Sequence, residues 1–163
     1  MRHHKQRLLH RPEEGQQGDC YRTALACLLD YDDPTAIPHF MDDPDEPPVE
    51  TWRRVDEWLA EHHGLRHFEL PLVPADRSAQ EIMDWIGAMW PGLRVLFSGK
   101  SPRGYQHNII IRDGCIEWDP HPDCSGVIEP GDDGYYWMGA FLPVAVHGAR
   151  PAVTGGTDKR DAA

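Results

Sequence analysis

The chain has 163 residues, of which 40% are hydrophobic, and this length and composition suit one folded domain with a buried core. Its formal net charge of −11 argues against a nucleic-acid partner, because phosphate backbones are bound by basic surfaces. No apolar run is long enough for a membrane span, and the start, MRHHKQRLLHRPEEG, lacks the apolar segment of a secretory signal, so we expect a cytoplasmic protein without a membrane partner.

The first predicted helix runs from about Asp19 to Tyr31, in the segment GDCYRTALACLLDY, and has a cysteine in its first turn. Gly18 supplies the turn before the helix, and the side chain of Asp19 can accept hydrogen bonds from its N-terminus. Cys20 follows, at a position where unpaired N–H groups and the helix dipole stabilise a thiolate. Helical spacing predicts a buried face that Cys20 shares with Ala24, Cys27, Leu28 and Tyr31.

Two more helices and a strand are predicted before residue 90. A helix from about Val49 to His63 ends at Gly64, and the strand that follows, LRHFELPL (65–72), is expected to end through Pro71 and Pro74. The third helix is predicted over 79–89, before Pro91-Gly92. Its apolar face is predicted to contain Ile82, Trp85, Ile86 and Met89.

Between the first two helices lies the acidic segment MDDPDEPPVE, which prolines interrupt. A run of charges of this kind is typical of a solvated surface loop. The alternative is an acidic rim that selects a basic peptide or an amine.

After residue 92 the pattern changes from helical to extended. Runs rich in β-branched and aromatic residues predict strands over 93–98, 107–112, 115–119 and 135–146. Asp113-Gly114 predicts a two-residue hairpin turn, which would pair Arg112 with Cys115 and Asp119 with Asn108.

Helices followed by an antiparallel sheet indicate an α+β fold. We expect one domain over residues 1–147. The small, polar and charged residues 148–163 predict a disordered tail.

The candidate active site combines Cys20 with two residues from the second half of the chain. A buried nucleophilic cysteine needs a base from elsewhere, and His107 begins a predicted strand. Asp119 ends the next strand. A small change of register there would bring its carboxylate to the same face of the sheet as the imidazole. Taken singly, each residue has an ordinary structural role, as a small apolar side chain, a hydrogen-bonded strand residue or a turn former. Together they have the order of a nucleophile, a base and an orienting acid.

The four cysteines are expected to be free thiols in a reducing compartment. The sequence has no C-x-x-C pair, so we expect no zinc and no other metal or cofactor. Cys27 and Cys115 are predicted to be inert core residues. Cys124 lies in a predicted exposed loop, with nothing local that would activate it.

GDCYRTALACLL and, far downstream, HNIIIRDGCIEWDP together resemble the papain-like cysteine hydrolase superfamily. The similarity is closest to bacteriocin-processing peptidase domains, in which Asp-Cys opens a helix and a His is followed by Asp-Pro on the next strand. The segment SPRGYQHNIIIRDGCIEWDPHPDCSG is also similar to small uncharacterised phage and bacterial proteins of that fold. The resemblance covers about Gln6 to Trp137. It implies N-terminal helices packed on an antiparallel sheet, with Cys20 as nucleophile, His107 as base and Asp119 as orienting acid.

The family also uses a glutamine shortly before the cysteine as an oxyanion-hole donor. Here the position at papain-like spacing is Glu14, which cannot donate when it is ionised. Gln6 fits this role if the intervening loop is extended, and Gln17 fits if the loop is tight. Both remain candidates.

The sequence therefore predicts a cysteine hydrolase that cleaves or transfers at an amide or peptide bond through a thioester intermediate. Its substrate would be a peptide, a protein or a small amide. Peptidase, amidase, deamidase and transglutaminase chemistry share this triad. The alternative is a non-catalytic interaction module on the same fold, such as a phage protein that binds a host factor. The oligomeric state is left open.

Overall fold

A computed structural model describes residues 1–144, so the predicted tail and the end of the predicted strand 135–146 lie outside the described residues. The helices are α1 (Cys20–Leu28), α2 (Pro48–His63) and α3 (Ala79–Met89), with short 3-10 helices η1 (Pro12–Glu14) and η2 (Pro34–Ala36). The strands are β1 (Leu65–Leu72), β2 (Arg94–Lys100), β3 (Gln106–Arg112), β4 (Cys115–Trp118) and β5 (Tyr136–Pro143). In this part of the chain the strands form one antiparallel sheet in the order β1-β5-β2-β3-β4, which confirms the α+β prediction.

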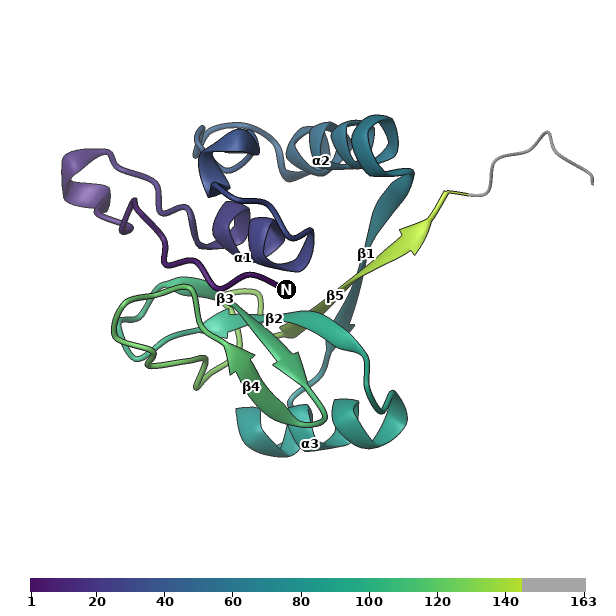
Figure 1. Cartoon of the computed structure of the whole chain (residues 1–163). Coiled ribbons are helices and arrows are strands. Elements are labelled where there is room, and N and C mark those ends of the chain that lie inside the picture. Colours follow the sequence, from purple (N-terminus) through teal and green to yellow (C-terminus); the bar gives the residue numbers. More distant parts are fainter. Residues whose placement is uncertain (145–163) are drawn as a thin grey trace, which may run out of the picture.

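The sheet lies between two helical layers, with α1 and α2 on one face and α3 on the other (Figure 1). Leu96 and Ile110 belong to the core beneath α1 and α2, whereas Phe97, Ile109 and Ile111 belong to the core against α3. Successive residues of the central strands are therefore buried on opposite faces. This double burial explains why β2 and β3 have continuous apolar runs instead of alternating polar and apolar residues.

The hairpin between β3 and β4 has the predicted turn. Asp113 and Gly114 both have positive φ angles, of 52° and 79°, as a type I′ turn requires, and Arg112 pairs with Cys115 as expected. Helix α3 packs directly on this turn. A Cβ atom on Gly87 would lie 2.2 Å from the backbone nitrogen of Gly114, so only glycine fits there.

Beyond the turn, β4 contains a bulge that the sequence did not predict. Ile111 pairs with Ile116, but Ile110 pairs with Trp118, which leaves Glu117 as the extra residue. The predicted pairing of Asp119 with Asn108 is therefore wrong by one position. Because side chains alternate between faces, this shift moves Asp119 to the opposite face from the one expected.

Other expectations for individual elements also need correction. Helix α1 ends at Leu28, not near Tyr31, and Pro71 lies inside β1. A proline is tolerated there because β1 is an edge strand. Trp85 and Met89 are exposed, because the stripe of α3 that meets the sheet lies to one side of them. That stripe consists of Ala79, Ile82, Met83 and Ile86.

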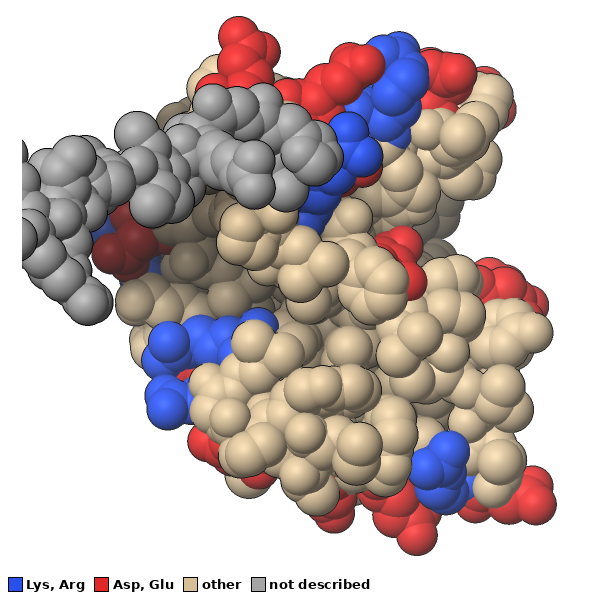
Figure 2. All heavy atoms as spheres, turned by 90° about the vertical axis from the view of Figure 1, so that its right-hand side faces the viewer, with Lys and Arg blue, Asp and Glu red and all other residues tan. Residues whose placement is uncertain are grey.

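Figure 2 shows the face that lies at the right of Figure 1. Its middle is mostly uncharged, and the acidic side chains lie mainly toward its margins. Among residues 1–144, no helix is both long and apolar enough to cross a membrane.

Candidate active site

Cys20 is the first residue of α1 and is partly exposed to a cavity. The side chain of Asp19, just before it, does not cap the helix as predicted. Instead it is buried, accepts a hydrogen bond from the Leu8 N–H at 2.9 Å and pairs with Arg22 at 2.5 Å. The Asp19 N–H in turn donates to the Leu8 carbonyl at 3.0 Å. Asp19 therefore ties the N-terminal segment to the start of α1.

His107 and Asp119 form a hydrogen-bonded pair in the interior. His107 Nε2 lies 2.8 Å from Asp119 Oδ1, and the two residues are only 2% and 4% exposed. The same carboxylate accepts hydrogen bonds from the backbone of His121 at 2.7 Å and of Gly126 at 2.9 Å. Three donors therefore hold the carboxylate, and it fixes the orientation of the imidazole ring.

Cys20 and His107 alter one another's protonation. Burial raises the pKa of the Cys20 thiol, but the hydrogen bond and charge of His107, with hydrogen bonds from Asn108, outweigh burial and lower it. Burial lowers the pKa of His107, but Asp119 and Cys20 reverse this effect and raise it to about 9. Burial likewise raises the pKa of Asp119, but His107 and the two backbone donors lower it overall. These shifts favour a thiolate beside an imidazolium.

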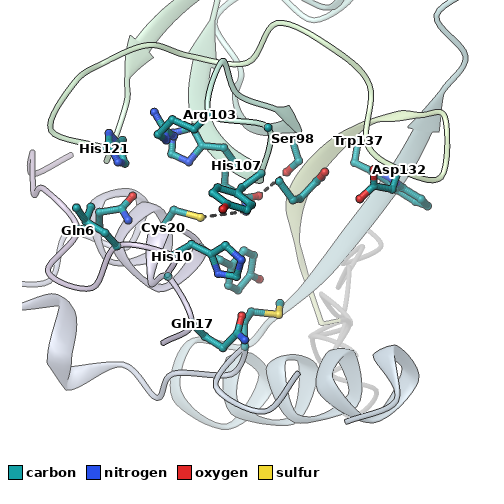
Figure 3. A pocket seen from close by; sticks show the side chains of 18 of the residues that line it. Gln6, His10, Gln17, Cys20, Ser98, Arg103, His107, His121, Asp132 and Trp137 are labelled. Atoms are coloured by element: carbon teal, nitrogen blue, oxygen red, sulfur yellow. Dashed lines mark hydrogen bonds between the residues drawn. The ribbon is translucent and has the colours of Figure 1, made fainter. Parts of the chain in front are cut away.

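Asn108 is a site residue whose role was not recognised in the sequence. Its Nδ2 donates to Cys20 Sγ at 3.7 Å, and its Oδ1 accepts from the hydroxyl of Ser98 (Figure 3). Because β4 pairs with β3 only as far as Ile110, no strand among residues 1–144 pairs with this part of β3 on the β4 side. The sequence did not indicate the bulge or how early β4 ends, and therefore did not indicate that Asn108 contacts Cys20.

Both candidate oxyanion donors line the cavity, whereas Glu14 lies exposed in η1 and pairs with Arg11. Gln6 is 8% exposed; its Nε2 donates to the Leu8 carbonyl at 2.8 Å, and its backbone N–H donates to the Pro120 carbonyl at 2.9 Å. Gln17 is less buried, and its side chain has no hydrogen bond to any described residue. Gln6 is therefore held rigidly and Gln17 is not.

The cavity has a volume of about 830 Å³ and extends from Cys20 across the face of the sheet (Figure 3). Its walls come from the N-terminal segment, the start of α1 and α2, and strands β1, β2, β3 and β5. Aromatic and acidic side chains are prominent among the lining residues: Tyr21, Trp52, Tyr105, Trp137, Glu69, Asp132 and Asp133.

The other thiols are Cys27, Cys115 and Cys124. Cys27 is buried as predicted, but Cys115 is exposed because it opens the edge strand β4. Cys124 is exposed as expected, but it has an unexpected charged neighbour, since Lys5 Nζ donates to its sulfur at 2.9 Å. Within the described residues, no group of three or more His, Cys, Asp or Glu side chains is arranged to hold a metal ion.

No family model matches the chain, and no curated protein or solved structure matches it either. The function must therefore be inferred from the site itself.

Proposed function

We propose that the protein is a cysteine hydrolase of papain-like type that acts on amide or peptide bonds. The observation that carries this proposal is the buried contact of His107 with Asp119, at 2.8 Å, beside a thiol whose pKa the same histidine lowers. Each of these residues has an ordinary structural role on its own. Together they form a thiolate beside an imidazolium, at a helix N-terminus and open to a cavity, and this is the arrangement that nucleophilic catalysis by cysteine requires.

In the proposed reaction, the Cys20 thiolate attacks the carbonyl carbon of the substrate. The C–N bond then breaks, and the imidazolium of His107 gives its proton to the departing amine, which leaves a thioester. A water molecule attacks the thioester while His107 takes its proton. The C–S bond breaks and the acid product leaves, which restores the Cys20 thiolate beside the His107 imidazolium.

The oxyanion that forms in each step needs donors near the thiol. Helix α1 supplies backbone N–H groups, because the first N–H groups of a helix have no partner within it. We assign the side-chain donor to Gln6, because one proton of its Nε2 is used by Leu8 and the other remains available. A donor that is already fixed stabilises the oxyanion without reorganisation.

Thiol reactivity tests the proposal and separates it from a non-catalytic interaction module. Limiting iodoacetamide at about pH 6, followed by mass spectrometry, should modify Cys20 before exposed Cys115, because His107 lowers the pKa of the Cys20 thiol and thiolate is the reactive form. His107→Ala should abolish this preference. Cys20→Ala should remove the label and change the thermal midpoint by only a few degrees, since so small a truncation costs about 1 kcal/mol.

Equal modification of Cys20 and Cys115 in the wild type would favour the interaction module. Preferential modification that persists in His107→Ala would show that the histidine does not activate the thiol.

A further inference from the structure

The floor of the cavity is a row of residues that crosses the sheet away from Cys20. Asn108 pairs with Ser98, and Ser98 pairs with Trp137, so the three side chains lie on one face of β3, β2 and β5. Glu69 of β1 pairs with Gly139, two residues beyond Trp137, and therefore lies on this face too. Adjacent strands are about 4.8 Å apart, and β1 is separated from β3 by β5 and β2. Glu69 on β1 therefore lies about 14 Å from β3, the strand whose Asn108 contacts Cys20.

Glu69 has no cationic partner among residues 1–144. Its nearest basic group is His67, whose Nε2 lies 4.0 Å from Glu69 Oε1, and burial lowers the pKa of His67 to about 4. At neutral pH that ring is therefore uncharged. Burial and the negative charge of Asp133 raise the pKa of Glu69 to about 7. Among the described residues, neither Glu69 nor Asp133 therefore has a charged cation as a partner.

The neighbouring carboxylates of the cavity differ in their partners. Asp133 accepts hydrogen bonds from Trp137 Nε1 at 2.8 Å and from the Tyr135 N–H at 3.0 Å, and both donors are neutral. Asp132, in contrast, pairs with Lys100 at 2.5 Å. Within the described part of the chain, a cation therefore lies beside Asp132, whereas none pairs with Glu69 or Asp133.

An unpartnered polar group points to a ligand at the same place. Tyr21 lines the cavity and is only 3% exposed, yet its hydroxyl has no hydrogen-bond partner among the described residues. Burial, with the negative charges of Glu69 and Asp56, raises the pKa of this phenol well above its usual value, so the hydroxyl is neutral. Buried hydroxyls nearly always have a partner, so a bound group is expected to supply one. Trp52, whose ring centre lies 5.5 Å from that of Tyr21, adds an aromatic wall.

We propose that Glu69, Asp133 and Tyr21 form a subsite for the cationic side chain of a lysine or arginine in a peptide substrate. Trp52 and Trp137 flank this subsite, and aromatic faces attract cations. The proposal rests on the proposed function, because it identifies the substrate class of the same cavity. An extended peptide advances about 3.3 Å per residue, so about four residues span about 14 Å, and fewer suffice because a lysine or arginine side chain covers part of that span. The basic residue would therefore lie about two to four residues from the bond that is cleaved.

The subsite is tested with short peptides that carry a chloroacetyl group, which alkylates Cys20, and that differ at one position three residues away. The position holds lysine, arginine, norleucine or glutamate, and mass spectrometry gives the second-order rate at Cys20. Both basic probes should react about ten times faster than the norleucine probe, the equivalent of about 1.4 kcal/mol. The glutamate probe should be the slowest.

Glu69→Gln should lower the rates of both basic probes to that of the norleucine probe. Asp132→Asn is the matched control, because it removes a cavity carboxylate that Lys100 already compensates, and it should keep the preference. Thermal unfolding of each variant confirms that it is folded. A preference for lysine alone or arginine alone would narrow the ligand to an ammonium or a guanidinium.

Equal rates for all four probes in the wild type would overturn the subsite and leave the proposed function standing. A failure of every probe to modify Cys20 would overturn the proposed function instead. In that case calorimetry measures the affinities of the lysine and norleucine peptides without the reactive group. Tighter binding of the lysine peptide would support the subsite, and equal affinities would overturn it.

Discussion

His107 Nε2 reaches Asp119 Oδ1 at 2.8 Å because β4 contains one residue more than the partner strand needs. In a regular hairpin from Asp113-Gly114, Asp119 would pair with Asn108, and its side chain would point to the face opposite to that of His107. Glu117, the extra residue, moves the carboxylate to the other face. The bulge is therefore a part of the site although it contacts none of the reacting atoms.

Deletion of Glu117 should separate the pair. The regular register would be restored, His107 would lose the carboxylate that keeps it protonated, and preferential alkylation of Cys20 at mildly acidic pH should disappear. Glu117→Ala is the control, because it keeps the bulge and removes only the ion pair with Arg94. A deletion variant that is folded by circular dichroism and still alkylated at the wild-type rate would contradict this role of the bulge.

The dependence of the Cys20 alkylation rate on pH should show the effect of His107 on the pKa of the thiol. Because the pKa of Cys20 is lowered from its usual 9.0, the alkylation rate should have its midpoint below pH 9 and fall only as pH drops through that lowered value. In His107→Ala the main lowering influences are lost while burial remains, so the midpoint should move upward. Rates measured with iodoacetamide between about pH 5 and 10 test this prediction, and an unchanged midpoint in the variant would refute it.

Asp119→Asn should weaken both reactivity and stability. The sequence suggested a role in ring orientation and charge alone, but the structure shows a buried carboxylate with three hydrogen-bond donors. We expect partial Cys20 reactivity and a loss of about 1–3 kcal/mol in the free energy of unfolding. Denaturant titrations of wild type and variant measure this loss.

The loss depends on pH in a defined direction. The pKa of Asp119 is lowered on folding, so its charged form stabilises the protein above its usual pKa of 3.8, and this stabilisation is lost as pH falls through the folded value. The difference between wild type and Asp119→Asn should therefore shrink in acid. A difference that stays constant down to about pH 2 would mean that the charge of Asp119 does not contribute.

Much of the fold was predictable because its signals are local. The turn at Asp113-Gly114 follows from residues that tolerate positive φ, and Gly64 ends α2 in the left-handed conformation that glycine favours. The bulge at Glu117 was not predictable, since nothing in CIEWD distinguishes a regular strand from a bulged one. It depends on tertiary contacts.

The candidate site was predictable only in part for the same reason. Cys20, His107 and Asp119 could be selected by residue type and order. The contacts of Asn108 and the Asp19–Leu8 link depend on how distant segments meet, and so does the carboxylate pair of Glu69 and Asp133.

Gly87→Ala should destabilise the protein although it improves helix propensity. In an exposed helix this change would stabilise by roughly 1 kcal/mol. Here the new Cβ atom would lie 2.2 Å from the nitrogen of Gly114 and 2.5 Å from the carbonyl carbon of Asp113, and backbone atoms cannot move aside cheaply. We expect a lower thermal midpoint and a displaced β3–β4 hairpin. A raised midpoint would show that α3 can shift away from the turn.

The choice between Gln6 and Gln17 can be made with two reactions of the same thiol. Acylation of Cys20 by p-nitrophenyl acetate passes through an oxyanion, whereas alkylation by iodoacetamide does not. Because removal of one oxyanion donor costs about 100-fold or more in rate, Gln6→Ala should slow acylation by that order and leave alkylation nearly unchanged. Gln17→Ala, at a second cavity glutamine without a fixed side chain, is the matched control and should affect neither reaction. If Gln17→Ala alone slows acylation, the donor is Gln17. If Gln6→Ala slows both reactions equally, Gln6 positions the thiol and does not stabilise the oxyanion.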